Sequence, residues 1–135
     1  MNETRVYLGL DVGERRIGLA KGDSVGRIAQ PLRFLPVDGH ESDYLRRIIA
    51  EEGIHELVVG MPRNMAGEPT NQTAYVQQVA KAKLEPLNIP LHWQDESLTS
   101  VMAEERLLAR NKPYTKGDVD AEAASIILQD FLNTL

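Results

Sequence analysis

Val6-Tyr-Leu-Gly-Leu10 is a short, almost unbroken apolar run that ends at Asp11, and it decides the fold class. A run of this kind is typical of a strand that is buried on both faces of a sheet. The residues after it, Asp-Val-Gly-Glu-Arg-Arg at 11–16, predict a tight turn, and Ile17 to Lys21 predicts the partner strand of a hairpin. The chain is therefore expected to begin with a central strand and an antiparallel neighbour.

The rest of the chain alternates between strand and helix patterns. Further strands are predicted at 27–37, 54–60 and 90–94, helices at 42–52, 70–84, 98–110 and 119–132, and a polar loop at 111–117. Strands joined through helices run parallel, with right-handed crossovers. The sequence predicts an α/β fold in which a five-stranded mixed sheet is flanked by helices. By length, residues 1–135 are expected to form one domain.

The composition favours an intracellular globular protein. Hydrophobic residues make up 42% of the chain, which is enough for a core, and the absence of cysteine excludes disulfides and thiolate metal sites. The N-terminus does not have the basic region and long apolar stretch of a signal peptide. No apolar run reaches the ~18 residues that a membrane span needs. We therefore expect a cytoplasmic protein with no membrane partner.

The charge pattern leaves two interpretations open. The net charge of −5 disfavours a nucleic-acid partner, but the distribution of charge matters more than its sum. Between residues 106 and 117 there are four bases and no acid, and Arg15 and Arg16 form a second basic spot. A solvated helix end with an exposed loop is the simpler interpretation of such a run, and a phosphate-binding surface is the alternative.

Three acidic side chains are predicted to meet at one edge of the sheet. Asp11 directly follows the first strand and Glu96 follows the last, and ligands bind outside the carboxyl ends of parallel strands. Asp120 heads the apolar face of the last helix, because apolar residues follow it at i+4, i+7 and i+11. The alternative explanation is that Asp120 only stabilises the helix start, worth roughly 0.3–1 kcal/mol, with Asp118 as N-cap.

Carboxylates that are forced together repel one another, and divalent cations relieve that repulsion. Oxygen ligands in an incomplete cage suit Mg²⁺ or Mn²⁺. Two such ions can activate a water molecule and stabilise the leaving oxygen in phosphodiester cleavage. The histidines share no metal-ligand spacing, and we interpret all three as structural or surface residues: His40, His55 and His92.

Four blocks of the chain resemble, in order and spacing, the signature blocks of the YqgF/RuvX family. They are LGLDVGERRIGLA, VVGMPRNMAG, DESLTS and VDAEAASIIL. This family is described as pre-16S rRNA nucleases and is related to the Holliday-junction resolvase RuvC. The resemblance implies a ribonuclease-H-like fold and a hydrolase that trims the 5′ end of 16S ribosomal RNA.

The resemblance also implies roles for individual residues. Asp11 matches the acid of the family's first strand, Glu96 the acid of its Asp-Glu pair, and Asp120 the acid of its Val-Asp-Ala, so these three would be the catalytic metal ligands. Further matches with family positions are Gly13, Gly18, Gly60, Pro62, Asn64 and Gly67. The chain departs from the pattern at Ser97, where the family has Arg, and at Arg63 and Ala66, where it has Leu and Asp. These departures affect substrate contacts and leave the metal ligands intact.

Basic and polar side chains around this edge are the candidates for binding substrate phosphates. They are Arg15, Arg16, Arg63, Asn64, Arg110, Lys112 and Lys116. Tyr114, at the tip of the polar loop, could stack on an unpaired base. The expected partner is ribosomal RNA precursor, bound by a monomer or a homodimer. Branched DNA is the alternative substrate, and cutting a four-way junction would require a dimer with two sites.

Two other classes of function fit the sequence less well than a nuclease. The Asp-x-Gly turn and hairpin also resemble the phosphate loop of actin-like ATPases and sugar kinases, but those folds need two such domains around a cleft. A non-catalytic RNA-binding domain would gain nothing by clustering acids near phosphates.

Overall fold

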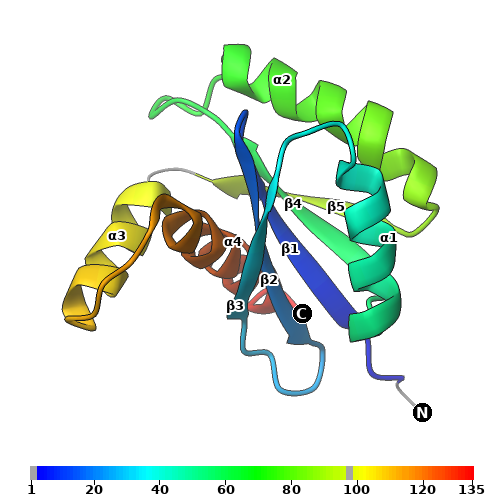
Figure 1. The fold of residues 1–135 in the computed structure, drawn as a ribbon, viewed down its shortest axis with the longest axis horizontal. Coiled ribbons are helices and arrows are strands. Elements are labelled where there is room, and N and C mark those ends of the chain that lie inside the picture. Colours follow the sequence, from blue (N-terminus) through cyan, green and yellow to red (C-terminus); the bar gives the residue numbers. More distant parts are fainter. Residues whose placement is uncertain (1–2, 97–98) are drawn as a thin grey trace.

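The computed structural model describes residues 3–96 and 99–135, and its centre is a mixed five-stranded sheet (Figure 1). The strands are β1 (Val6–Val12), β2 (Arg16–Asp23), β3 (Gln30–Pro36), β4 (Glu56–Pro62) and β5 (Leu91–Glu96). Their order across the sheet is β3-β2-β1-β4-β5. β1 pairs antiparallel with β2, as β2 does with β3, whereas β4 runs parallel to both β1 and β5. The predicted mixed sheet is confirmed.

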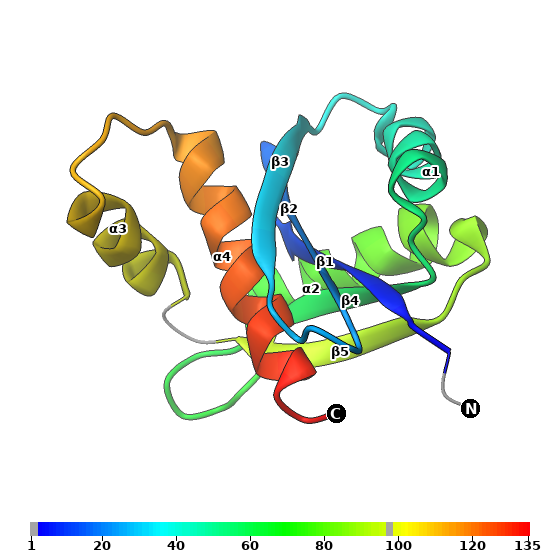
Figure 2. The ribbon, with the colours of Figure 1, turned by 90° about the horizontal axis from the view of Figure 1, so that it is seen from below.

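Helices cover both faces of this sheet (Figure 2). α1 (Glu41–Glu52) and α2 (Asn71–Val79) pack on one face through Leu45, Ile48 and Val76. α4 (Lys116–Leu132) packs on the other face through Ala124, Ile127 and Leu128. α3 (Thr99–Ala109) lies outside α4 and packs against it in a small separate cluster of buried side chains. None of the helices within residues 3–96 and 99–135 is long and apolar enough to span a membrane.

The last helix begins earlier than predicted. α4 starts at Lys116, three residues before the expected start at Val119. Thr115 is its N-cap: the Thr115 hydroxyl accepts from the backbone N–H of Asp118, and the Asp118 carboxylate accepts from the backbone N–H of Thr115. This capping box satisfies two backbone donors at once. The prediction that Asp118 is the N-cap is therefore wrong, and Asp120 lies one turn inside the helix.

Two other predicted boundaries differ from those in the structure, each because of the local backbone conformation. β3 begins at Gln30 rather than at 27, because Arg27 takes a left-handed backbone conformation with φ 55° and turns the chain. The predicted helix at 70–84 is α-helical only to Val79 and continues as one π-helical turn, η1 (Ala80–Leu84), and one 3₁₀ turn, η2 (Glu85–Leu87). The predicted start of the next helix at 98 lies outside the described residues.

Gly18 and Gly60 allow α4 and the Glu96 side chain to lie close to the sheet. A Cβ atom at Gly18 in β2 would overlap the backbone oxygen of Asp120 in α4. A Cβ atom at Gly60 in β4 would overlap the Glu96 carboxylate and also Ile127. Any larger residue at either position would push α4 or Glu96 away from the sheet, so both glycines position the acidic residues.

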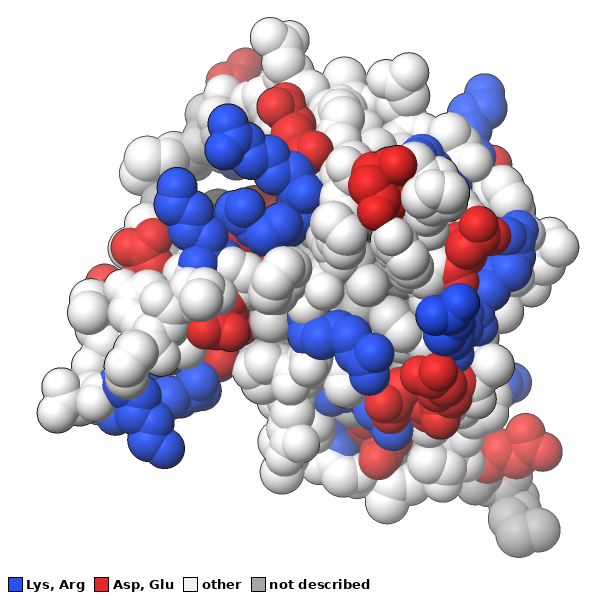
Figure 3. Space-filling model, in the orientation of Figure 1, with Lys and Arg blue, Asp and Glu red and all other residues white. Residues whose placement is uncertain are grey.

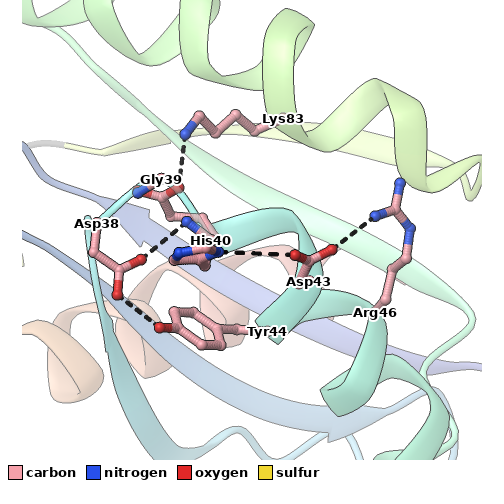
Figure 4. Close-up of polar contacts among 8 residues, drawn as sticks. Asp38, Gly39, His40, Asp43, Tyr44, Arg46 and Lys83 are labelled. Carbon is pink, nitrogen blue, oxygen red and sulfur yellow. Dashed lines mark hydrogen bonds and ion pairs between the residues drawn. The ribbon is translucent and has the colours of Figure 1, made fainter.

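A polar network fixes the start of α1 on the opposite face of the sheet (Figure 4). The Tyr44 hydroxyl donates to Asp38 at 2.6 Å, and the Lys83 ammonium group in η1 donates to Glu41 at 2.6 Å. Glu41 is almost fully buried. The network ties the β3–α1 connection to the segment that follows α2, so it has a structural role on the face away from α4.

Candidate active site

The structure brings the three predicted acids to one edge of the sheet, on the face that α4 covers. Asp11 is the sixth residue of β1 and pairs with Gly18, which lies under Asp120. Glu96 is the last residue of β5 and lies against Gly60 of β4. The sequence predicted that Asp11 and Glu96 directly follow their strands. In the structure both residues belong to the strands, because β1 extends to Val12 and β5 to Glu96. The strand alternation directs both carboxylates toward α4.

Burial dominates the electrostatics of this group. Burial raises the pKa of Asp11 to about 7, and the negative charge of Asp120 contributes to the rise. Burial also raises the pKa of Glu96 to about 8, with a further contribution from the charge of Asp11. The Glu96 Oε2 atom is buried and has no hydrogen-bond partner among the described residues. A buried carboxylate oxygen without a partner costs free energy, and this is the position that a bound cation would satisfy.

Asp120 has a different environment, because its carboxylate forms an ion pair with an arginine. The Arg16 Nε atom donates to Asp120 Oδ2 at 2.6 Å, and both side chains are about one quarter exposed. Within residues 3–96 and 99–135, no three His, Cys, Asp or Glu side chains are arranged to hold one ion. The arrangement is thus a close pair, Asp11 and Glu96, with a third acid beside it whose carboxylate is engaged by Arg16.

Three of the predicted phosphate-binding bases already have carboxylate partners. Besides Arg16, the Arg63 Nε atom donates to Asp95 at 2.9 Å. Arg110 donates from both terminal nitrogens to Glu122, at 2.9 and 3.1 Å. In this structure these guanidinium groups join elements of the protein to one another.

Of the other predicted substrate-binding residues, one shapes a loop and three are exposed. The Asn64 Oδ1 atom accepts from the backbone N–H groups of Ala66 and Glu68, so Asn64 shapes the β4–α2 loop. Arg15, Lys112 and Lys116 are exposed, and in the described part of the chain no carboxylate lies within ion-pair distance of them. On the face of the molecule that Figure 3 shows, charges of both signs are mixed.

Sequence reasoning missed the partner of the basic run. That partner is Glu122 of α4, an acidic side chain that is only 2% exposed. It binds Arg110 and also lies 3.6 Å from Arg106, which is one turn earlier on α3. The i, i+4 spacing of Arg106 and Arg110 indicates a shared acidic partner. It does not identify that partner, because Glu122 lies on another helix, 12 residues after Arg110.

Comparisons with known proteins bear on this site and fold. Residues 5–134 match the model of the RuvX family, described as Holliday junction resolvase. A protein of Chloroflexus aggregans named "Putative pre-16S rRNA nuclease" is 45% identical over 98% of this chain and 96% of its own length. A protein of the same name from Synechocystis sp. is 40% identical over 98% of this chain and 90% of its own.

Solved structures with the same fold include RuvC of Thermus thermophilus in complex with a Holliday junction substrate. Its TM-score is 0.60 at 17% identity, and the match covers 96% of this chain and 94% of that one. A second structure of the same RuvC has a TM-score of 0.54 at 12% identity. Likeness at this level of identity shows the fold alone. The predicted ribonuclease-H-like fold is confirmed.

Proposed function

The chain belongs to the RuvX family, and on that premise we propose that residues 1–135 form a single nuclease domain that hydrolyses phosphodiester bonds with divalent metal ions. A fold does not fix a function, so the proposal depends on the site. The observation that carries it is the half-buried pair of Asp11 and Glu96. The pKa values of both are raised, and the buried Glu96 Oε2 atom has no hydrogen-bond partner among the described residues. Such a pair is costly unless a cation neutralises it.

The chemistry of the donor set fits a hard cation. Asp11 and Glu96 would hold it, with Asp120 as the third ligand once its carboxylate is released from Arg16. Three carboxylates without histidine or cysteine suit Mg²⁺ or Mn²⁺. When bound, the ions supply a nucleophile at neutral pH and stabilise charge on the oxygens of the transition state.

The chain's own bases would orient the substrate. Arg16, which donates to Asp120, would be available for a phosphate if that carboxylate served as a metal ligand. Arg15, Arg63, Lys112 and Lys116 would contact the RNA backbone, and Asn64 would keep the β4–α2 loop in shape. Arg110 is half exposed, but we assign it mainly to holding α3 on α4, because both of its terminal nitrogens donate to Glu122.

We propose structured RNA as the substrate, specifically the 5′ end of the 16S ribosomal RNA precursor. Relatives that share 40–45% identity with this chain are named "Putative pre-16S rRNA nuclease". This substrate implies a cytoplasmic location and an enzyme of the hydrolase class that acts on ester bonds. The test is cleavage by the purified protein of labelled 16S precursor fragments, single-stranded RNA and four-way DNA junctions, with Mg²⁺, Mn²⁺ or EDTA. Metal-dependent cutting of the precursor fragment alone supports the proposal, and no cutting of any RNA contradicts it.

The second candidate is resolution of four-way DNA junctions. It is favoured by the description of the family model and by the junction-bound RuvC structure with the same fold. Two strands must be cut at one junction, so this function requires a homodimer with two sites. Light scattering of the protein with and without junction DNA, beside the cleavage screen, separates this candidate from an RNA nuclease that acts as a monomer.

A further inference from the structure

A hollow of about 280 Å³ lies beside α4, on the flank away from the three acids. Its walls come from β3, from the connection between α3 and α4, and from α4 itself. Asp118 and Glu122 face the hollow. Asp120 lies two residues from each of them and therefore points to the opposite flank of the helix.

Two exposed aromatic side chains line this hollow. Phe34 of β3 is 43% exposed and Tyr114 of the α3–α4 connection is 37% exposed. The Phe34 ring lies directly on Gly117 in the first turn of α4, where a Cβ atom would overlap it, so its position is fixed. Aromatic rings that remain accessible in a concave surface are the platforms on which single-stranded nucleic acids stack their bases.

The charges around the hollow suit a phosphate-bearing ligand. Its lining contains three bases, Arg33, Arg110 and Lys112, and two acids, Asp118 and Glu122. Arg110 neutralises Glu122, and the Asp118 carboxylate accepts from the backbone at the helix start. Arg33 lies 3.8 Å from Glu52, so the exposed Lys112 is the base of the lining that remains available for a phosphate.

We propose that the hollow binds an unpaired base of single-stranded RNA, stacked on Tyr114 and Phe34, with the adjoining phosphate at Lys112. This inference rests on the proposed nuclease function and gives its substrate a single-stranded segment. The width of α4, about 10–12 Å with side chains, separates the bound base from the acids. The hollow therefore recognises a nucleotide that flanks the scissile bond. A base in a duplex is already stacked and paired, so duplex RNA would not use this site.

The test is RNA binding by full-length Asp11→Asn protein in EDTA, measured by fluorescence anisotropy with a labelled single-stranded RNA and its duplex. We expect Tyr114→Ala to weaken single-strand binding by about 5- to 150-fold, the range for loss of one stacked base. Tyr114→Phe should bind as the parent does. Phe34→Leu keeps the apolar contact with Gly117 and should also weaken binding. Trp93→Ala removes an exposed aromatic from the edge strand β5 and is the matched control, with no expected change.

A second readout detects stacking itself. RNA in which 2-aminopurine replaces successive bases should show quenched fluorescence at one position, and Tyr114→Ala should remove that quenching. The inference is overturned if the Asp11→Asn protein binds no single-stranded RNA, if Tyr114→Ala binds as its parent does, or if duplex binding falls equally. Cleavage by the wild-type protein is measured separately. Absence of cleavage with intact Tyr114-dependent binding would count against the nuclease and not against the hollow.

Discussion

Replacing Glu96 by Gln is predicted to stabilise the metal-free protein. The pKa of Glu96 lies near 8 instead of 4.5, chiefly because of burial, so the folded state disfavours its charge. Each pKa unit is worth about 1.4 kcal/mol, which gives an upper limit of about 5 kcal/mol above pH 8 and about 3 kcal/mol at pH 7. The side chain is only partly buried from solvent, and solvation of the charge lowers this cost. We expect a net gain of about 1–2 kcal/mol.

The pH dependence of the free energy of unfolding tests independently whether the Glu96 charge destabilises the folded protein. A carboxyl group with a raised folded-state pKa favours folding most below its unfolded pKa, near 4.5, and this contribution is lost as the pH rises toward 8. Asp11 acts in the same direction between about 4 and 7. The free energy of unfolding of the wild-type protein should therefore fall between pH 5 and 8.5, and Glu96→Gln should flatten the fall.

The assay is urea unfolding followed by circular dichroism, in EDTA at pH 5, 7 and 8.5. Asp95→Asn is the matched control: Asp95 is the adjacent acid, but it is exposed and paired with Arg63. It should not stabilise the protein. Mn²⁺ at ten times its dissociation constant should then stabilise the wild-type protein by about 1.4 kcal/mol and Glu96→Gln much less. If Glu96→Gln is less stable than the wild type at pH 8.5 in EDTA, the reasoning from buried charge is refuted.

Three further predictions follow from the contacts of single residues. Asp11→Asn should abolish cleavage without loss of folding, whereas Asp118→Asn should change turnover little and cost about 0.3–1 kcal/mol at the helix start, as measured by single-turnover kinetics and thermal unfolding. Arg110→Ala should lower the free energy of unfolding by about 1–3 kcal/mol, because the buried Glu122 carboxylate then keeps only the more distant Arg106 as a partner. Stability equal to that of the wild type would contradict this. Lys112→Ala with Lys116→Ala should not destabilise the protein but should reduce the salt dependence of RNA binding by roughly one log–log unit per lost phosphate contact, and an unchanged slope would show that RNA runs elsewhere.

The order of strands and helices could be predicted, because the spacing of apolar residues and the length of each apolar run can be read from the local sequence. The apolar run at Val6–Leu10 and the alternation of strands and helices gave the mixed sheet and the edge at which Asp11 and Glu96 lie. The i+4, i+7 pattern after Asp120 placed it on the sheet-facing side of α4. Boundaries were less accurate, because the Thr115 capping box and the π-helical turn at Ala80 depend on single contacts.

The pairing of charges could not be predicted in the same way. The run from 106 to 117 contains bases and no acid, which suggested free phosphate-binding groups. In the structure Arg110 binds Glu122 from the neighbouring helix, and Arg16 binds Asp120, more than 100 residues away. Such partners are determined by how helices dock, and the sequence shows only that the charges exist. The buried state of Glu122 follows from the same docking.

We propose that Asp11, Glu96 and Asp120 together hold the metal ions that hydrolyse RNA. The deciding measurement is single-turnover cleavage of a 16S precursor fragment by the variants Asp11→Asn, Glu96→Gln and Asp120→Asn, with calorimetry of Mn²⁺ binding to each variant. We predict that all three variants remain folded, lose cleavage, and bind Mn²⁺ with less heat than the wild-type protein. Wild-type turnover in any one variant would remove that residue from the site, and full activity of the wild-type protein in excess EDTA would contradict the metal-dependent mechanism itself.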